Sequence, residues 1–172
     1  AVRVFDVSAN GDVAPLRTLS GGNTGFSDPV GVVVTGNELF VSDQSNDTIT
    51  VFPSNANGDV GPTRTIGGAN TQINQAHQLA TAGGEIFVAS FSGDSVQVFS
   101  TADNGNVAPL RNLVGANTGI NEPRGVAVSG SELFVCCRTG SVRVFPINAT
   151  GNVAPIRVIS GASTALGQPE GI

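Results

Sequence analysis

The feature that most limits what this chain can fold into is an internal repeat of about 47 residues. The apolar-x-Val-Phe pattern that begins at Val2 returns at positions 49, 96 and 142, at intervals of 47, 47 and 46 residues. After each copy, an Asn-Gly or Thr-Gly turn, a proline and an arginine follow at nearly the same spacing. A period of this length marks one supersecondary unit that cannot bury its apolar face alone. The chain is therefore expected to be an array of stacked units.

Each unit is expected to contain four short strands separated by turns. In the second unit the candidate segments are 30–34, 38–41, 49–52 and 62–66. The first is almost continuously apolar, as in a strand covered on both faces, whereas the third alternates apolar and polar residues. Asn57-Gly58 favours a tight turn, and Pro62 suits the beginning of an outer edge strand. No apolar period of 3.6 residues competes, so we expect almost no helix.

Four-stranded units of this kind must stack face to face to bury their apolar sides. Radial stacking of such sheets around a common axis is the propeller solution. The sequence therefore predicts an all-β fold, a β-propeller of four-stranded antiparallel blades.

The repeat also resembles a known family, the NHL-like β-propellers, in particular the bacterial ones. The resemblance rests on Ala9–Leu19 (ANGDVAPLRTL), Pro123–Val128 (PRGVAV) and Glu132–Val135 (ELFV), and it extends over essentially the whole chain. It implies that the Pro-x-Gly strand is innermost in each blade and that the Pro-Leu-Arg-Thr-Leu strand is outermost. Because propellers of this kind serve as binding platforms, lactonases and lyases alike, the resemblance does not choose among these functions.

The strand order implied by the resemblance divides the chain into about 3.6 blades. Residues 1–20 hold the last two strands of one blade, residues 29–67, 76–114 and 123–160 hold whole blades, and residues 169–172 begin a further innermost strand. A four-blade ring would lack the second strand of its shared blade and would leave an exposed sheet edge. Either residues outside positions 1–172 or another chain is expected to complete the ring. The break within a strand favours additional residues, because natural boundaries normally lie in loops.

Charge and composition argue against some partners. The net charge is -5 and the eight cations are all arginines, so no basic face is available to neutralise the phosphates of a nucleic acid. No apolar stretch approaches the roughly 18–20 residues that span a bilayer. The low charge without lysine, together with the family resemblance, suggests an extracytoplasmic or secreted protein.

The two cysteines, Cys136 and Cys137, are adjacent, and neighbouring side chains of a strand point to opposite faces. We therefore expect no disulfide between them. They also fit no zinc-binding spacing. No metal and no cofactor is predicted.

Residues that recur in every unit are best explained by packing. Three glutamates begin the second strand and four arginines lie on the outer strand, and we expect them to form structural ion pairs. These residues are Glu38, Glu85 and Glu132, and Arg17, Arg64, Arg111 and Arg157.

Functional specialisation is expected where one unit departs from the others. The residue before the glycine of the innermost strand varies, being Val30, His77, Arg124 or Glu170. In the resembled fold these four lie near the central channel on one rim. His77 is also set apart because Gln75–Gln78 replaces the usual Pro-x-Gly. The polar members His77, Arg124 and Glu170 are candidates for binding an anion or for acid–base chemistry.

Asp43 and Cys137, at the end of the second strand, are two further ligand-binding candidates. The segment 43–47 resembles the beginning of a calcium loop but lacks the glycine and the distal glutamate, so an aspartate capping a turn explains it better. A nucleophilic Cys137 would need a base within reach, and His77 is the only histidine. Phe91, in a turn, is either a contact residue or a plug between blades.

The function predicted from these features is a non-catalytic β-propeller interaction or structural module, which is part of a larger propeller. Its protein or small-molecule ligand is not identified by the sequence. The alternative is a lactonase- or lyase-like propeller enzyme with a polar or metal site at the mouth of the channel. The innermost strands offer few of the acidic, amide or histidine side chains that such enzymes need.

Overall fold

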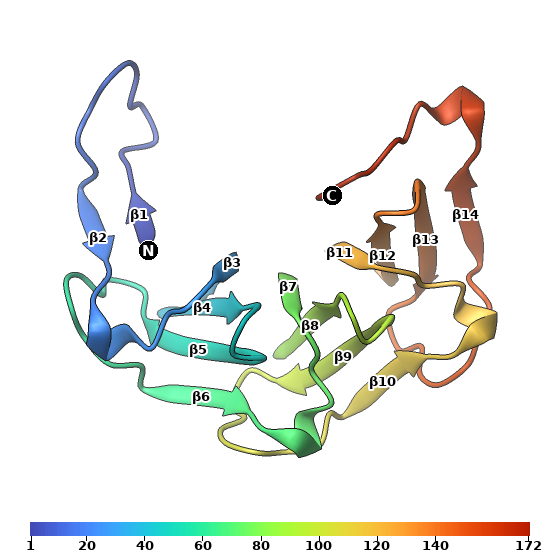
Figure 1. The fold of residues 1–172 in the computed structure, drawn as a ribbon, viewed down its shortest axis with the longest axis horizontal. Coiled ribbons are helices and arrows are strands. Elements are labelled where there is room, and N and C mark those ends of the chain that lie inside the picture. The colour runs from blue at the N-terminus through green and yellow to red at the C-terminus, as the bar shows by residue number, and fades with distance from the viewer.

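The structure is a computed structural model that describes all residues 1–172, and its fold is all-β. Its strands form one two-stranded and three four-stranded antiparallel sheets, which Figure 1 shows along an open arc. The two-stranded sheet, β1 (Val2–Val4) and β2 (Arg17–Leu19), lies at one end of the arc. The predicted fold class is confirmed.

Each four-stranded sheet is a simple meander in which neighbours in sequence are neighbours in space. The first comprises β3 (Pro29–Thr35), β4 (Glu38–Asp43), β5 (Thr48–Pro53) and β6 (Arg64–Gly67). The second comprises β7 (Ala76–Ala82), β8 (Glu85–Ser90), β9 (Ser95–Ser100) and β10 (Arg111–Val114). The third comprises β11 (Pro123–Ser129), β12 (Glu132–Cys137), β13 (Ser141–Pro146) and β14 (Arg157–Ser160).

The hydrophobic core lies between the sheets. Three apolar clusters of 4, 10 and 11 buried residues follow one another along the arc. Each cluster joins an outer-strand residue of one sheet to a phenylalanine of the next, as Ile66 and Phe99 show in the middle cluster. A sheet therefore depends on its neighbour for burial, as the repeat predicts.

Three junctions between successive sheets share one set of hydrogen bonds. At the first, the backbone N–H of Ser20 donates to the carbonyl of Gly58 (3.1 Å), and the N–H of Gly58 donates to the carbonyl of Thr18 (2.8 Å). Asp59 Oδ1 then accepts a bond from the N–H of Asn23 (2.7 Å), in the short helical turn that follows β2. The same two backbone bonds recur at Gly105 and Gly151, and Asn106 and Asn152 replace the aspartate.

Three of the four repeated arginines pair with the repeated glutamate of their own blade, which confirms the expected ion pairs for these three. Arg111 holds both carboxylate oxygens of Glu85 at 2.7 Å. The pairs Glu38–Arg64 and Glu132–Arg157 have the same bidentate form. The hydrogen bonds from the guanidinium groups lower the pKa of each of these glutamates. A lowered carboxyl pKa means that the stabilisation exists above the ordinary glutamate pKa and is lost as the pH falls below it.

Two details differ from the expectation. Four 3₁₀-helical turns of three residues each, η1 (Gly22–Thr24), η2 (Ala69–Thr71), η3 (Ala116–Thr118) and η4 (Ala162–Thr164), follow the outer strands. Residues 169–172, expected to begin an innermost strand, form no strand, because no second strand lies beside them to supply hydrogen bonds. They instead lie against β11, and the Sγ–H of Cys136 on β12 donates to the carbonyl of Pro169 (3.3 Å).

Candidate functional site

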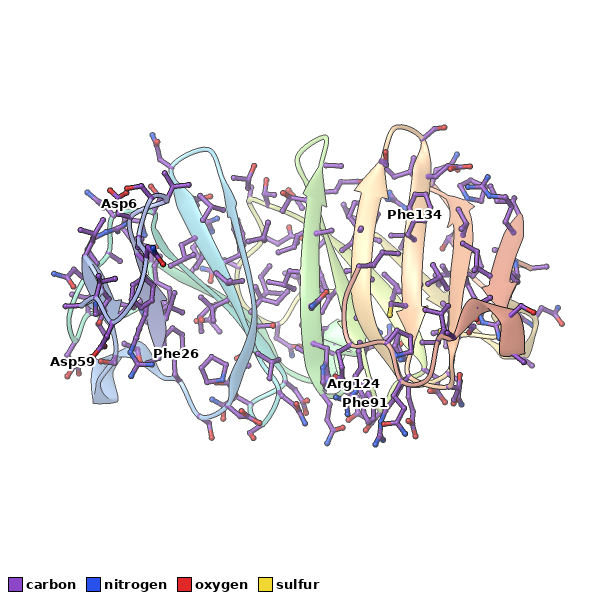
Figure 2. All side chains as sticks on the ribbon, turned by 90° about the horizontal axis from the view of Figure 1, so that it is seen from above. Asp6, Phe26, Asp59, Phe91, Arg124 and Phe134 are labelled. Carbon is purple, nitrogen blue, oxygen red and sulfur yellow. The ribbon has the colours of Figure 1, made fainter.

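The structure brings three of the predicted site residues together at one rim. His77 lies on β7 and Arg124 on β11, the innermost strands of neighbouring sheets, and Glu170 lies in the C-terminal segment beside β11. Phe91 enters the group from the turn after β8. Figure 2 shows Arg124 and Phe91 side by side at this edge of the molecule. We call His77, Phe91, Arg124 and Glu170 the rim cluster.

The rim cluster is a stack with Phe91 at its centre. The ring centroids of His77 and Phe91 are 5.1 Å apart with the planes tilted by 35°. The guanidinium carbon of Arg124 lies 5.0 Å from the centroid of the same Phe91 ring, which is cation–π geometry. Arg124 also forms an ion pair with Glu170 through Nη1 and Oε2. Phe91 therefore fills the space between two blades, and its ring contacts both His77 and Arg124.

His77 is buried, and its Nε2 has no hydrogen-bond partner. Burial lowers the pKa of the imidazole from its ordinary value of 6.5, and the positive charge of Arg124 lowers it further. The carboxylates of Glu170 and Asp28 act in the opposite direction and are outweighed. The imidazole is consequently neutral at pH 7.

The unfolding free energy is expected to fall as the pH is lowered from about 7.5 to 6, above the range in which the glutamates take up protons. The folded protein binds the His77 proton less readily than the unfolded chain, so acid favours unfolding below the ordinary histidine pKa. Urea unfolding at a series of pH values measures this dependence. Since His77 is the only histidine, His77→Gln should remove the slope in this range. A slope that persists in the variant would show that other groups cause it.

Asp43 does not belong to the rim cluster. Its buried carboxylate accepts hydrogen bonds from the backbone N–H groups of Ser27 (2.7 Å), Asp28 (3.0 Å) and Asn46 (3.0 Å). These bonds hold the loop before β3 and the turn after β4. Asp43 thus has the capping arrangement that the sequence favoured over a calcium loop.

The equivalent position in the third four-stranded sheet, Cys137, is buried in the apolar cluster that also holds Phe87 and Phe145. Both cysteines are free thiols. Burial raises the pKa of Cys136, and the neighbouring Cys137 and Glu170 raise it further. The raised pKa of Cys136 disfavours its thiolate, which is the nucleophilic form of cysteine.

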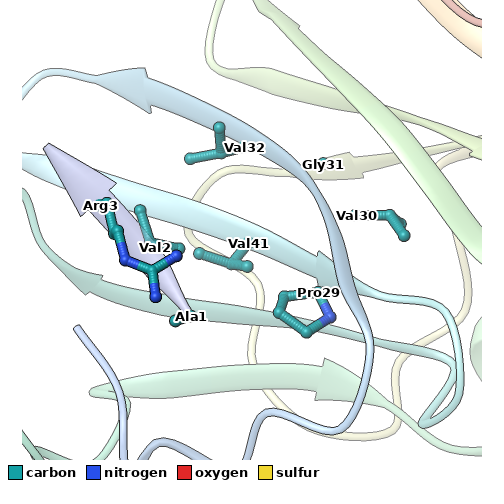
Figure 3. A pocket seen from close by; sticks show the side chains of 8 residues that line it. All are labelled: Ala1, Val2, Arg3, Pro29, Val30, Gly31, Val32 and Val41. Carbon is teal, nitrogen blue, oxygen red and sulfur yellow. The ribbon is translucent and has the colours of Figure 1, made fainter. Parts of the chain in front are cut away.

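Val30, the fourth residue of the predicted rim set, faces a different part of the molecule. It lines a hollow of about 220 Å³ beside the free edge of β1, together with Val2, Arg3 and Val32 (Figure 3).

Arg17 is the one outer-strand arginine without a glutamate, and its Nη1 donates to the carbonyl of Ser54 instead (2.8 Å). In the other blades the second strand supplies that glutamate.

The central position of Phe91 was the part of the site that the repeat alone did not reveal. The available signal was that Phe91 takes the place of Gln44 and Arg138 in the equivalent turns of the other blades.

No three histidine, cysteine, aspartate or glutamate side chains of residues 1–172 lie close enough together to hold a metal ion.

Comparison with known proteins supports the fold and no named function. No protein-family model and no curated protein matches the chain. A chain of the nidogen/laminin complex superposes with a TM-score of 0.66 at 15% identity, over 86% of this chain and 52% of its own. The computationally designed Ika8 protein gives 0.61 at 16%, over 92% of this chain and 42% of its own. A protein of unknown function from Desulfotomaculum acetoxidans DSM 771 gives 0.59 at 23%, over 78% and 43%.

These likenesses define the chain as an all-β protein with a propeller-like fold. It spans about half the length of the matched nidogen/laminin chain and less than half of the other two. Its only helical elements are three-residue turns, and none is long enough to cross a membrane.

Proposed function

We propose that the chain is a non-catalytic interaction or structural module of the NHL-like type that works outside the cytoplasm. The observation that carries this proposal is that the charge of Arg124 is already paired within the rim cluster. Arg124, the cation expected to receive an anion, is already engaged by the Glu170 carboxylate and the Phe91 ring. The extracytoplasmic location is supported by the family resemblance.

The use of the repeated residues supports the same role. The glutamate–arginine pairs and the Asn-Gly or Thr-Gly turns serve blade packing in the three complete units. At the rim, the Glu170 side chain is 60% exposed beside Arg124 and is available to a partner. The nidogen/laminin neighbour is itself part of a protein complex, and this is consistent with a role in protein contact.

One observation favours the enzyme alternative. A neutral buried imidazole with an unpartnered Nε2 beside an Arg–Glu pair contains the residue types of an acid–base or metal site. In a propeller enzyme such a site would bind a metal or an anionic substrate at the channel mouth. Metal binding therefore separates the metal-dependent form of this enzyme from the non-catalytic module.

For a non-catalytic module we expect Ca²⁺ or Zn²⁺ at about 1 mM to leave the thermal unfolding midpoint unchanged. A metal at about 100 times its Kd would add about 2.7 kcal/mol of stability, which raises Tm by roughly 5–10 °C in a domain of this size. Differential scanning fluorimetry with and without each metal measures the effect.

The matched variants are His77→Gln and Glu170→Gln in the rim cluster, with Glu122→Gln as a control acid outside it. A metal-dependent rise in Tm that disappears in the rim variants and persists in Glu122→Gln would overturn the proposal in favour of the enzyme. A rise of equal size in all variants would indicate a metal elsewhere and would leave the rim without the ligand that an enzyme needs.

A further inference from the structure

Two of the three junctions between successive sheets contain an Asn-Gly step, the dipeptide in which an asparagine side chain reacts most readily with the backbone. Asn57-Gly58 lies against β2, and Asn104-Gly105 lies against β6, between the first and second four-stranded sheets. Glycine has no side chain to hinder the approach of its nitrogen to the preceding amide. The turns that hold the blades together therefore also contain two reactive steps.

Both Asn-Gly steps are open to water. Asn57, Gly58, Asn104 and Gly105 are all exposed at the surface. The base and the water molecule that amide loss requires can therefore reach them. Burial gives these steps no protection, so any protection must come from their hydrogen bonds.

The nitrogen that would react is the nitrogen that holds the junction. The N–H of Gly105 donates to the carbonyl of Thr65 (2.7 Å), and the Oδ1 of Asn104 accepts from the N–H of Thr65 (3.2 Å). The same pair of bonds joins the Asn57-Gly58 step to Thr18, at 2.8 and 3.1 Å. Attack requires the glycine nitrogen to lose its proton and to turn toward the side chain. The junction bond and the reaction therefore exclude each other.

We propose that Asn57 and Asn104 are deamidation sites that react only while their junction is open, and that the reaction then prevents the junction from closing. At Asn104, a base takes the proton from the nitrogen of Gly105, and this nitrogen forms a bond to Cγ of Asn104. The bond from Cγ to the side-chain nitrogen breaks, and that nitrogen takes up a proton and leaves as ammonia. Water then opens the succinimide ring at one of its two carbonyls and leaves aspartate or isoaspartate. Because the succinimide nitrogen carries no hydrogen, the donor to Thr65 is already lost in the first step.

The isoaspartate product changes the backbone at the centre of the junction. Its main chain runs through the former side chain and is longer by one carbon atom. Two further bonds of the junction follow this link: the carbonyl of Gly105 accepts from the N–H of Gly67 (3.2 Å), and Asn106 Oδ1 accepts from the N–H of Asn70 (2.7 Å). A displaced chain cannot satisfy all these donors, so the two blades should separate more often.

The third junction provides a natural comparison, because threonine replaces the asparagine there. The N–H of Gly151 still donates to the carbonyl of Asn112 (2.7 Å), as its counterparts do in the other junctions. Thr150 has no side-chain amide and cannot form a succinimide. The junction therefore does not need asparagine, and Asn104→Thr is a matched control that keeps the backbone bonds.

The first experiment follows deamidation of Asn57 and Asn104 in the whole chain by peptide mapping with mass spectrometry at mildly alkaline pH. Both sites should react at least about tenfold more slowly in the folded protein than in the chain unfolded by urea, because only a minor, locally opened state reacts. Phe99 and Val107 pack in the cluster between the first and second four-stranded sheets, away from the Asn57 junction. Phe99→Ala should therefore speed the reaction at Asn104 by about tenfold and leave Asn57 within about twofold of its rate. Phe99→Leu replaces this variant if the alanine protein does not fold.

Three outcomes of this experiment would overturn the proposal. The first is an equal rate in the folded and the unfolded chain. The second is an equal acceleration of both sites in the Phe99 variant, since the reactive opening would then not be local to one junction. The third is an Asn104 that reacts in urea but stays intact in both folded proteins.

The second experiment measures the effect on the junction. In a background of Asn10→Thr and Asn57→Thr, Asn104 is the one remaining Asn-Gly step, and anion exchange separates the reacted chain by its added negative charge. Asn104→Asp carries that charge on a normal backbone, and Asn104→Thr carries no charge. The isoaspartate chain should exchange the amide hydrogens of Gly67 and Gly105 with solvent at least about tenfold faster than either variant. Equal exchange in all three would overturn the claim that the reaction keeps the junction open. None of these outcomes involves the rim cluster, so the proposed function is tested separately.

Discussion

Replacing Phe99 with alanine is expected to lower the free energy of unfolding by about 3–5 kcal/mol. Phe99 is fully buried in the cluster between the first and second four-stranded sheets, where it packs with Ile66, Leu79 and Ile86. Removing its ring leaves a cavity on the face that joins two blades, and the meander behind it has little freedom to collapse. Equilibrium urea unfolding of both proteins measures the difference.

The matched control is Phe5→Ala, the same substitution at the same position of the repeat. Phe5 is 47% exposed, so this change should cost less than about 1 kcal/mol. Equal losses at the two positions would contradict the conclusion that burial comes from the neighbouring sheet.

The second large effect is expected at Gly31, on the innermost strand β3. A Cβ atom at this position would lie 2.6 Å from the backbone carbonyl oxygen of His77 and 2.6 Å from Ser42 Oγ. The carbonyl belongs to the adjacent sheet, so Gly31→Ala must push two blades apart or distort a strand. We expect a loss of about 1–3 kcal/mol in unfolding free energy, the range for overpacking.

Gly22→Ala provides the comparison for this experiment. Gly22 has no atoms within 4 Å of its added Cβ and needs no positive φ, so the change should stay within about 0.5 kcal/mol of the wild type. Urea unfolding of the two variants side by side separates a steric effect from a general intolerance of alanine. A Gly31→Ala protein as stable as Gly22→Ala would mean that the blades are not in close contact at the centre.

The fold could be predicted from the sequence because each repeat buries its apolar face in the same way. Repeated copies of Val-Phe, of the Asn-Gly turn and of the outer-strand arginine set the strand positions and the direction of stacking. The 3₁₀ turns were missed because three residues are too few to show a helical period. Their signal was the recurring Gly-x-Asn-Thr segment, whose threonine hydroxyl donates back to the glycine carbonyl, as in Thr71 to Gly68 (2.7 Å).

The candidate site was accessible only in part. The repeat singled out His77, Arg124 and Glu170 because they differ at one position, and the stacking of blades brings that position together. It did not reveal that Phe91 lies between His77 and Arg124, because this contact depends on side-chain orientations in two different sheets. It grouped Val30 with them, although Val30 lines the hollow beside β1.

The uniformity of the junctions has a consequence for how such a chain changes over evolutionary time. Each boundary uses the same backbone bonds and the same type of turn residue, so a duplication or loss of one whole repeat by recombination recreates a compatible boundary at the point of exchange. No new surface has to arise before the altered gene product is able to fold. A single duplication or deletion is therefore enough to change the number of blades in such a chain.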